Sequence, residues 1–465
     1  MKSYIYYFSS LLFLLTSCFK GEKVDLIIHN AQIHTLNETN DIEDAIAIKD
    51  GKIIETGPER QILNKYTATE EIDAGSRSIY PSLTDFQSNL FDGVQQQLSL
   101  DLSLTNSEEE MLFRIEKYNQ KHNFNFILAY NLDTSFWKTS TKLSNDKINS
   151  LFENKPVYIV FSDKKNAILN EKALKIHKII SSNPIINFNT IKNQLPKFNK
   201  ELEIKELHKT LYKYLQYGIA NVHANNLSFE QIKTLESLEQ KVKIYPSLKI
   251  NSEKHNSYKN INSLLYIDST NIPNKEKTNE FIEFCLDKKK QIYFDIKDSL
   301  NLKKAILLCE KMDEVRKDHR WIIHYPYEMN TNEKEAISKA GAFLTFTPSD
   351  MIKNEKYYNY SNTIQQIGLF LIGSNFPVNN LYAYEVIQNA TTPNNTHALS
   401  LDETMKAYCY WSAFAMFNET KTGTLEKGKD ASLVVFEKPL KQNATLNSNY
   451  AKYVFQKGDK IYAID

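Results

Sequence analysis

Residues 291–324 read QIYFDIKDSLNLKKAILLCEKMDEVRKDHRWIIH and place two short apolar runs on either side of a longer amphipathic stretch. The runs are Gln291–Phe294 and Trp321–His324, and each has the length of a buried strand. Between them, Leu302–Met312 carries apolar residues at helical spacing. This order predicts a strand–helix–strand unit with two parallel strands and a covering helix.

The same alternation continues on both sides of this unit, through residues 80–423. Amphipathic stretches such as 204–216 separate further apolar runs, which stand at 126–130, 157–161, 218–223, 242–246, 342–346 and 369–373. About eight such units fit a (β/α)8 barrel of ~250 residues with insertions. We therefore predict an α/β fold with a TIM-like barrel, and a doubly wound open sheet is the alternative.

Both ends of the chain are rich in short β-like runs. These runs are 24–28, 46–54, 432–436 and 453–462. The second contains Asp50-Gly51 between apolar residues, which favours a tight hairpin turn. We expect one small β-sandwich domain assembled from both termini, residues 24–79 and 424–465, with the barrel at 80–423 between them.

The N-terminal segment has the order of a bacterial export signal. One basic residue, Lys2, precedes an apolar stretch at 4–15, and Leu15-Thr16-Ser17-Cys18 follows. This resembles a lipobox, in which the cysteine becomes the lipidated first residue. We expect a signal peptide at 1–17, a lipid on Cys18, a linker at 18–23 and attachment to a membrane of the cell envelope. A plain signal peptide and an uncleaved anchor are the alternatives.

The composition is that of an ordinary globular protein. The chain has 465 residues, of which 42% are hydrophobic and 24% charged, and 57 Lys and Arg balance 56 Asp and Glu. This balance predicts no nucleic-acid partner. Cys285, Cys309 and Cys409 lack metal-binding spacing and are expected to be buried thiols, with a disulfide between two of them as the alternative.

Several segments, in order, resemble the amidohydrolase superfamily, and within it the branch that includes N-substituted formamide deformylases. The segments are 25–36, 47–57, 155–159, 218–223, 373–378 and 423–435. Among them, Gly373-Ser374-Asn375-Phe376-Pro377-Val378 is similar to the family's Gly-Ser-Asp-x-Pro-Val. The resemblance implies hydrolysis of a carbon–nitrogen bond in a small amide. It also implies one or two divalent metal ions, such as zinc, at the C-terminal mouth of the barrel, where they activate water.

The first pair of metal-binding positions is changed in this chain. The family ends its first barrel strand with His-x-His, whereas the segment 80–89 retains Asp85 but has Gln87 and Asn89 in place of both histidines. A neutral amide offers only a weak carbonyl oxygen, so these residues are poor zinc ligands. The middle ligand position, a lysine or acid in the family, aligns with Leu264.

The later positions are partly retained. His324 matches a family histidine, and Asp295 replaces another, so these two are the remaining candidate metal ligands. Asn375 replaces the closing acid, and an amide cannot act as a general base. His324 and Asn375 therefore occupy the catalytic positions, in a site that we interpret as degenerate, with metal absent or weakly bound.

Three further residues are candidate ligand-binding groups. His223 follows an apolar run, Lys164 stands where the family often has Asp-Gly-His, and Trp137 matches a pocket-wall tryptophan. Each also has a structural interpretation, respectively a hydrogen-bonded strand-end histidine, a solvated loop and core packing.

Three functions follow from these residues. The chain is a degenerate amidohydrolase kept as a binding or assembly module, or an active single-metal enzyme that uses His324, Asp295 and His223. The third alternative is a surface lipoprotein that carries an unknown small molecule.

Overall fold

The computed structural model describes residues 21–464 except 123, 136, 138–144, 182, 259–263, 354–359, 393–397 and 442–448. The predicted export signal and Cys18 lie outside the described residues. The chain divides into two compact units. The barrel unit comprises residues up to Ser88, 213–375 and from Asn379 onward, and the inserted unit comprises 89–212 and 376–378.

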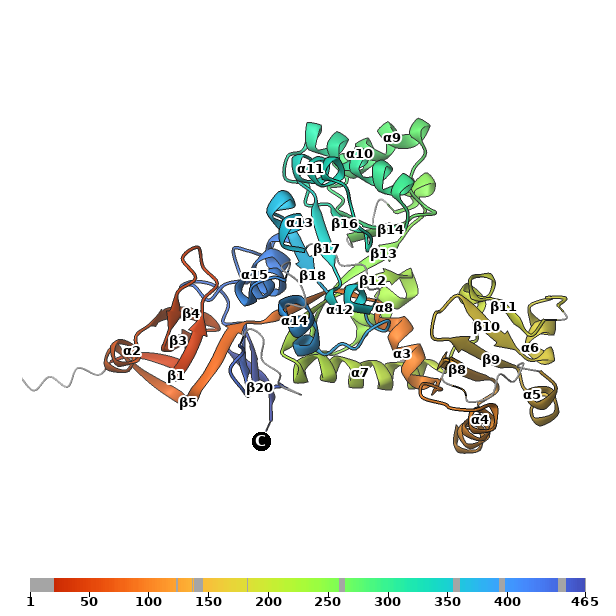
Figure 1. Ribbon diagram of the computed structural model, residues 1–465. Helices are drawn as coiled ribbons and strands as arrows, with labels where there is room; N and C mark the ends of the chain where they lie inside the picture. Colours follow the sequence, from red (N-terminus) through yellow and green to blue (C-terminus); the bar gives the residue numbers. More distant parts are fainter. Residues whose placement is uncertain are drawn as a thin grey trace, which may run out of the picture. The chain divides into compact units, whose positions relative to one another are not determined.

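The barrel unit contains eight parallel strands in a single sheet (Figure 1). In sheet order they are β6 (Leu83–Ser88), β12 (Ile219–Leu227), β13 (Lys243–Lys249), β14 (Leu264–Asp268), β15 (Ile292–Asp295), β16 (Ile322–His324), β17 (Phe343–Phe346) and β18 (Phe370–Ile372). After β18, the backbone N–H of Asn375 donates to the carbonyl of Gln87 at 2.8 Å. This bond brings the last segment onto the first strand and nearly closes the ring, so the predicted barrel is confirmed.

Helices connect these strands, as the alternating pattern predicts. They are α8 (Phe229–Ser237), α9 (Thr278–Asp287), α10 (Ser299–Val315), α11 (Thr331–Lys339), α12 (Pro348–Lys353) and α13 (Tyr360–Ile367), followed after β18 by α14 (Ala383–Thr391), α15 (Leu401–Lys406) and α16 (Ser412–Ala415). Helix α10 begins after Asp298, whose side chain accepts the backbone N–H of Asn301 and so satisfies one unpaired donor of the first turn. Figure 1 shows α9, α10 and α11 outside the strands, and the apolar side of α10, including Leu302 and Cys309, is buried.

A second sheet joins the two ends of the chain. Its order is β21 (Asp459–Ala463), β20 (Ala451–Gln456), β19 (Leu433–Phe436), β5 (Tyr66–Pro81), β1 (Glu22–His34), β3 (Ala45–Lys49) and β4 (Lys52–Gly57), with β2 (Ile42–Glu43) beside β1. The hairpin between β3 and β4 turns at Asp50 and Gly51, which have φ of 51° and 73°. The helix α2 (Glu59–Lys65) packs against these strands. Strands from both termini therefore share one sheet, and a separate β-sandwich domain at 24–79 and 424–465 stays a prediction.

The inserted unit has its own five-stranded sheet, which the sequence pattern did not predict. Its order is β11 (Ile185–Asn187), β10 (Asn166–Leu169), β9 (Val157–Phe161), β8 (Ile127–Leu132) and β7 (Leu100–Asp101), and its helices include α3 (Leu90–Leu98), α4 (Glu108–His122), α5 (Asn145–Leu151) and α6 (Glu171–Ile176). The runs 126–130 and 157–161, which we assigned to the barrel, fall in β8 and β9. That assignment was wrong because a short apolar run identifies a buried strand but not the sheet that it joins.

The structure describes the state of three cysteines and shows whether any helix could span a membrane. Cys285, Cys309 and Cys409 are buried free thiols, as expected. In the described part of the chain, no helix has the length and apolar character that crossing a bilayer requires.

A polar site at the mouth of the barrel

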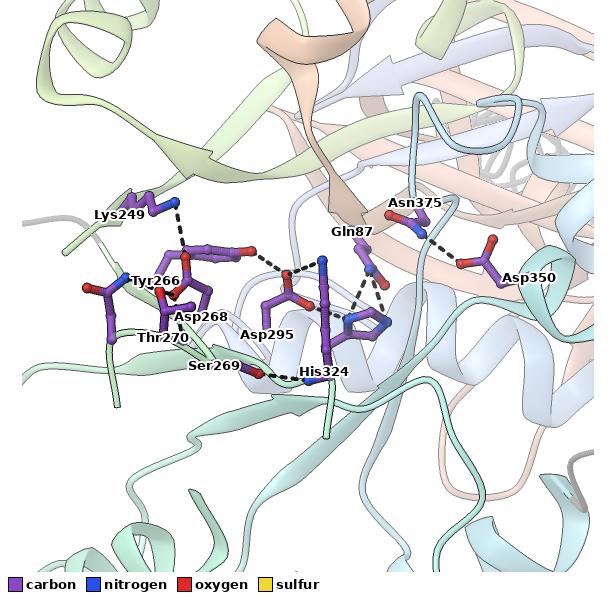
Figure 2. A network of polar contacts seen from close by, with 12 residues as sticks. Gln87, Lys249, Tyr266, Asp268, Ser269, Thr270, Asp295, His324, Asp350 and Asn375 are labelled. Carbon is purple, nitrogen blue, oxygen red and sulfur yellow. Dashed lines mark hydrogen bonds and ion pairs between the residues drawn. The ribbon is translucent and has the colours of Figure 1, made fainter. Parts of the chain in front are cut away.

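Side chains from β6, β15 and β16 meet at the C-terminal end of the barrel (Figure 2). Asp295 is the last residue of β15 and lies beside His324, the last residue of β16, in the parallel register. Gln87 comes from the end of β6. The structure thus brings together three of the residues that the sequence singled out, at the end of the barrel where enzymes of this fold place their active sites.

His324 and Asp295 form a close pair. The Nδ1 atom of His324 lies 2.8 Å from Oδ1 of Asp295, and Tyr266 donates its hydroxyl to Oδ2 of the same carboxylate at 2.5 Å. Burial alone would raise the pKa of Asp295. The hydrogen bond and charge of His324, together with Lys297 and Tyr266, hold this pKa well below its usual range. Asp295 is therefore an ionised acceptor that orients the imidazole.

The amide of Gln87 is fixed between two protein groups. Its Oε1 accepts the hydroxyl of Thr347 at 2.9 Å, and this contact orients Nε2 toward the imidazole of His324. Nε2 lies 3.2 Å from Nε2 of His324 and 3.4 Å from Nδ1. In the tautomer that donates from Nδ1 to the Asp295 carboxylate, Nε2 is the ring nitrogen that can accept from the amide. The result is a continuous chain of contacts, Asp295–His324–Gln87–Thr347.

Asn375 is held by a carboxylate that the sequence analysis did not identify. Its Nδ2 donates to Oδ2 of Asp350 at 2.7 Å (Figure 2). The Nδ2 atom of Asn379 donates to Oδ1 of the same carboxylate at 2.7 Å. Asp350 lies in the first turn of α12, just beyond β17. An acid in the first turn of a helix that follows a barrel strand was the available signal, because such loops form the mouth.

Asp85 joins the first strand to the segment after the last. Its Oδ1 accepts the backbone N–H groups of Gln87 at 3.1 Å and Ser374 at 2.9 Å, and its Oδ2 accepts the Ser374 hydroxyl at 2.6 Å. The side chain is fully buried, and burial raises the pKa of Asp85 to about 6. Asp85 thereby positions both Gln87 and the start of the Asn375 segment.

These residues do not fit the divalent metal centre that the resemblance implies. Zinc needs several imidazole, carboxylate or thiolate donors around one point. Here one imidazole and one carboxylate are bonded to each other, and the oxygen of Gln87 is bonded to Thr347. Among the residues that the structure describes, no three or more His, Cys, Asp or Glu are grouped so that they could hold a metal ion.

Leu264, which the sequence aligned with the family's middle metal ligand, does not lie at the mouth. Leu264 is the first residue of β14 and therefore lies at the opposite end of the barrel. Asp268 ends this strand in register with Asp295, and the Nζ atom of Lys249 lies 3.0 Å from its Oδ2. The residue of β14 at the mouth is an acid, paired with a lysine.

His223 does not end its strand, contrary to the expectation, but lies in the middle of β12. It is fully buried and its Nδ1 lies 3.1 Å from the carbonyl of Phe86, to which it donates. The ring packs against Phe86 and Tyr293, with centroid distances of 4.6 and 5.3 Å. Burial lowers the pKa of His223 to about 4, so the ring is neutral at physiological pH. Its place in the interior fits the structural interpretation.

The other predicted residues belong to the inserted unit. Trp137 is in that unit's apolar core and its Nε1 donates to the carbonyl of Thr105 at 3.0 Å. Lys164 lies in the turn between β9 and β10, with φ of 52° and Nζ 3.3 Å from Oε1 of Gln96. Asn89 directly precedes α3. A ligand-binding role for Trp137 and Lys164 stays a prediction.

The eight-stranded parallel barrel with a polar mouth makes this chain a TIM-like barrel protein with an added sheet from both termini. Comparisons with known proteins agree with this fold. No family model matches the chain. The chain is 26% identical over 161 residues to the putative amidohydrolase YtcJ of Bacillus subtilis. The matched region covers 34% of this chain and 30% of that protein. It is 34% identical over 98 residues to imidazolonepropionase of Brucella anthropi, and the matched region covers 20% of this chain and 24% of that protein. The chain thus spans less than a third of either relative.

A solved structure shows the same fold over nearly its whole length. An uncharacterized metal-dependent hydrolase from Pyrococcus furiosus superposes with a TM-score of 0.70 at 15% identity, covering 88% of this chain and 98% of the other. This match shows a shared fold, and the similarity to the putative amidohydrolase YtcJ extends over about a third of this chain.

Proposed function

We propose that this protein is a lipid-anchored, amidohydrolase-like binding protein. In this proposal the barrel mouth holds a small amide related to the substrates of the formamide deformylase branch, and the water activation by a bound metal that the family uses is lost or weak. An active enzyme with a single metal on His324 and Asp295 is the competing function.

The position of the Gln87 amide is the observation that carries this proposal. For Gln87 and His324 to ligate a metal, the amide would have to turn its oxygen away from Thr347, and His324 would have to release Asp295 or Gln87. Each of these steps breaks a buried hydrogen bond, and a buried group left without its partner costs about 1–3 kcal/mol. Metal binding at these residues would first have to offset these losses.

A neighbouring pair at the mouth, Asp350 and Asn375, has the groups that an amide ligand requires. An amide presents an N–H donor and a carbonyl acceptor. The carboxylate of Asp350, which is partly accessible, accepts donors, and the side-chain amide of Asn375 beside it has groups of both kinds. Few but fixed polar groups are typical of small-molecule sites.

Metal analysis tests the proposal directly. The full chain is purified, incubated with zinc or manganese, dialysed and analysed by inductively coupled plasma mass spectrometry. We expect well below one equivalent of metal, with no difference between the native protein and His324→Ala. His208→Ala is the matched control, because His208 is an exposed histidine. Stoichiometric metal that is lost in His324→Ala but kept in His208→Ala would establish the single-metal enzyme instead.

Ligand binding is tested by thermal shift with a panel of N-substituted formamides and other small amides. A ligand at 100 times its Kd stabilises the folded state by ~2.7 kcal/mol, which a melting curve resolves. We expect at least one amide to raise the Tm of the native protein and to lose this effect in Asp350→Ala. A panel without any shift would count against the binding function.

The lipid anchor rests on Leu15-Thr16-Ser17-Cys18 and has its own test. The protein is expressed in a bacterial host, and the membrane and soluble fractions are compared for the native chain and Cys18→Ala. We expect the native chain in the membrane fraction and the variant outside it. A Cys18→Ala chain that stays with the membranes would refute lipidation as the means of attachment.

A further inference from the structure

The barrel has a second hollow at the end opposite to Asp295 and His324. It has a volume of about 310 Å³ and is formed where β13, β14 and β15 begin. Three consecutive lysines, Lys288, Lys289 and Lys290, line it, and we call it the lysine hollow. The N-terminal end of such a barrel ordinarily serves stability, so an open charged hollow there needs its own explanation.

The three lysines stand on a rigid turn. Helix α9 ends at Asp287, and Lys289 reverses the chain with φ of 49°. The backbone N–H of Lys290 donates to the carbonyl of Cys285 at 2.8 Å, and its own carbonyl accepts Nε1 of Trp321 at 3.1 Å. These contacts fix the backbone positions from which the three lysines line the hollow.

The electrostatics of the hollow favour an anion. Among the described residues that line it there is no acid. The carboxylate of the neighbouring Asp287 pairs with Lys288 at 2.6 Å and is 69% exposed. Lys290 is only 6% exposed, and burial, together with the charge of Lys288, lowers its pKa.

Lysines near the end of a helix also stabilise its dipole, which offers a simpler explanation. That effect amounts to ~0.3–1 kcal/mol and falls off beyond the last turn. This effect accounts for Lys288. It does not account for Lys290, which is buried beyond the chain reversal, or for Lys289, whose left-handed backbone conformation is one that glycine usually adopts.

The remaining wall of the hollow is apolar and partly aromatic. It includes Pro246, Leu264, Met416 and Phe417. Phe417 is 44% exposed although its φ of 53° is strained for a bulky residue, and the guanidinium of Arg320 lies 4.0 Å from its ring centroid. Arg320 thus supports the ring on one face, and the exposed part of the ring borders the hollow.

We propose that the lysine hollow is a binding site for a small aromatic anion, a single ring with a carboxylate or phosphate group. The lysines would hold the acidic group, and Phe417 with the apolar wall would hold the ring. The volume is at the lower end of the ~300–1,000 Å³ of small-molecule sites, so it suits one ring and one acidic group. This site is separate from the mouth, and the inference does not depend on the function proposed there.

Isothermal titration calorimetry on the full chain tests the proposal with four probes: phenyl phosphate, benzoate, inorganic phosphate and benzyl alcohol. We expect phenyl phosphate or benzoate to bind, inorganic phosphate to bind more weakly and benzyl alcohol not to bind. No heat from either aromatic anion at millimolar concentration overturns the proposal. Inorganic phosphate that binds as tightly as phenyl phosphate overturns it as well, because the aromatic wall would then contribute nothing.

Variants assign the binding to this hollow. Lys289→Gln and Phe417→Ala change exposed side chains and should each weaken the aromatic anion about tenfold, the loss expected for one charge-assisted contact or one stacked ring. Lys303→Gln removes the same charge from an exposed position on α10 and should leave the affinity unchanged. Circular dichroism and the unfolding midpoint verify that each variant is folded. Equal weakening by Lys303→Gln and Lys289→Gln would overturn the assignment.

Discussion

The buried carboxyl of Asp85 predicts a pH-dependent stability of the barrel. Burial raises its pKa from 3.8 to about 6 in the folded chain. A folded-state pKa above the unfolded one means that the contribution to stability is fully present below pH 3.8. It is lost as the pH rises through about 6, because the buried group must then ionise. At 1.36 kcal/mol per pKa unit, the whole loss is ~3 kcal/mol, and most of it, between ~2 and 3 kcal/mol, falls between about pH 4 and pH 7.5.

Asp85→Asn removes this titration while keeping the shape and most of the hydrogen bonds. The amide oxygen can still accept the backbone N–H groups of Gln87 and Ser374, and the amide nitrogen can donate to the Ser374 hydroxyl after that hydroxyl rotates. We expect the variant to equal or fall slightly below the native protein near pH 4. Near pH 7.5 it should exceed the native protein by up to ~3 kcal/mol.

Urea unfolding followed by tryptophan fluorescence measures this difference. The chain has three tryptophans, of which Trp321 and Trp411 lie in the barrel unit and Trp137 in the inserted unit. A Trp137→Phe background therefore restricts the signal to the barrel. Other groups that titrate over this range are common to both proteins and cancel in the difference. A difference that does not change with pH, or that favours the native protein at high pH, would refute a raised pKa for Asp85.

Two further substitutions test the closure and the floor of the barrel. In Gly373→Ala the added Cβ would lie 2.4 Å from the backbone nitrogen of Gln87, so we expect a loss of ~1–3 kcal/mol in urea unfolding. Gly57→Ala, whose nearest neighbour is 3.8 Å away, should change the stability by less than ~0.5 kcal/mol, and equal effects would contradict the close approach. Arg320→Lys loses the paired contacts of 2.9 Å to both oxygens of Glu419 and should lower the unfolding free energy by about 2 kcal/mol. An unchanged midpoint of urea unfolding would show that the two hydrogen bonds between Arg320 and Glu419 do not stabilise the fold.

The sequence predicted the scaffold well because the scaffold depends on local patterns. The βαβ unit at 291–324 appears as β15, α10 and β16, and the Asp50-Gly51 turn forms its hairpin. Local patterns do not tell which sheet a strand joins. For that reason β8 and β9 were predicted in the barrel although they belong to the inserted unit.

The site was predicted in part, for a similar reason. Gln87, Asp295 and His324 could be placed together because their strands end at the same edge of a parallel sheet. Their partners could not be predicted. Thr347 and Asp350 come from the loop and helix after β17, and only the folded chain shows which side chain each of them reaches.

Two side-chain amides at the mouth, Gln87 and Asn375, each have a matched partner. Gln87 has a donor in Thr347 for its oxygen, and Asn375 has an acceptor in Asp350 for its nitrogen. Buried polar groups need such partners whatever their role, so these contacts hold both amides in place. We therefore expect that Asn375→Asp alone would not create a metal centre. It would instead place a second carboxylate against Asp350 and weaken the mouth by like-charge repulsion.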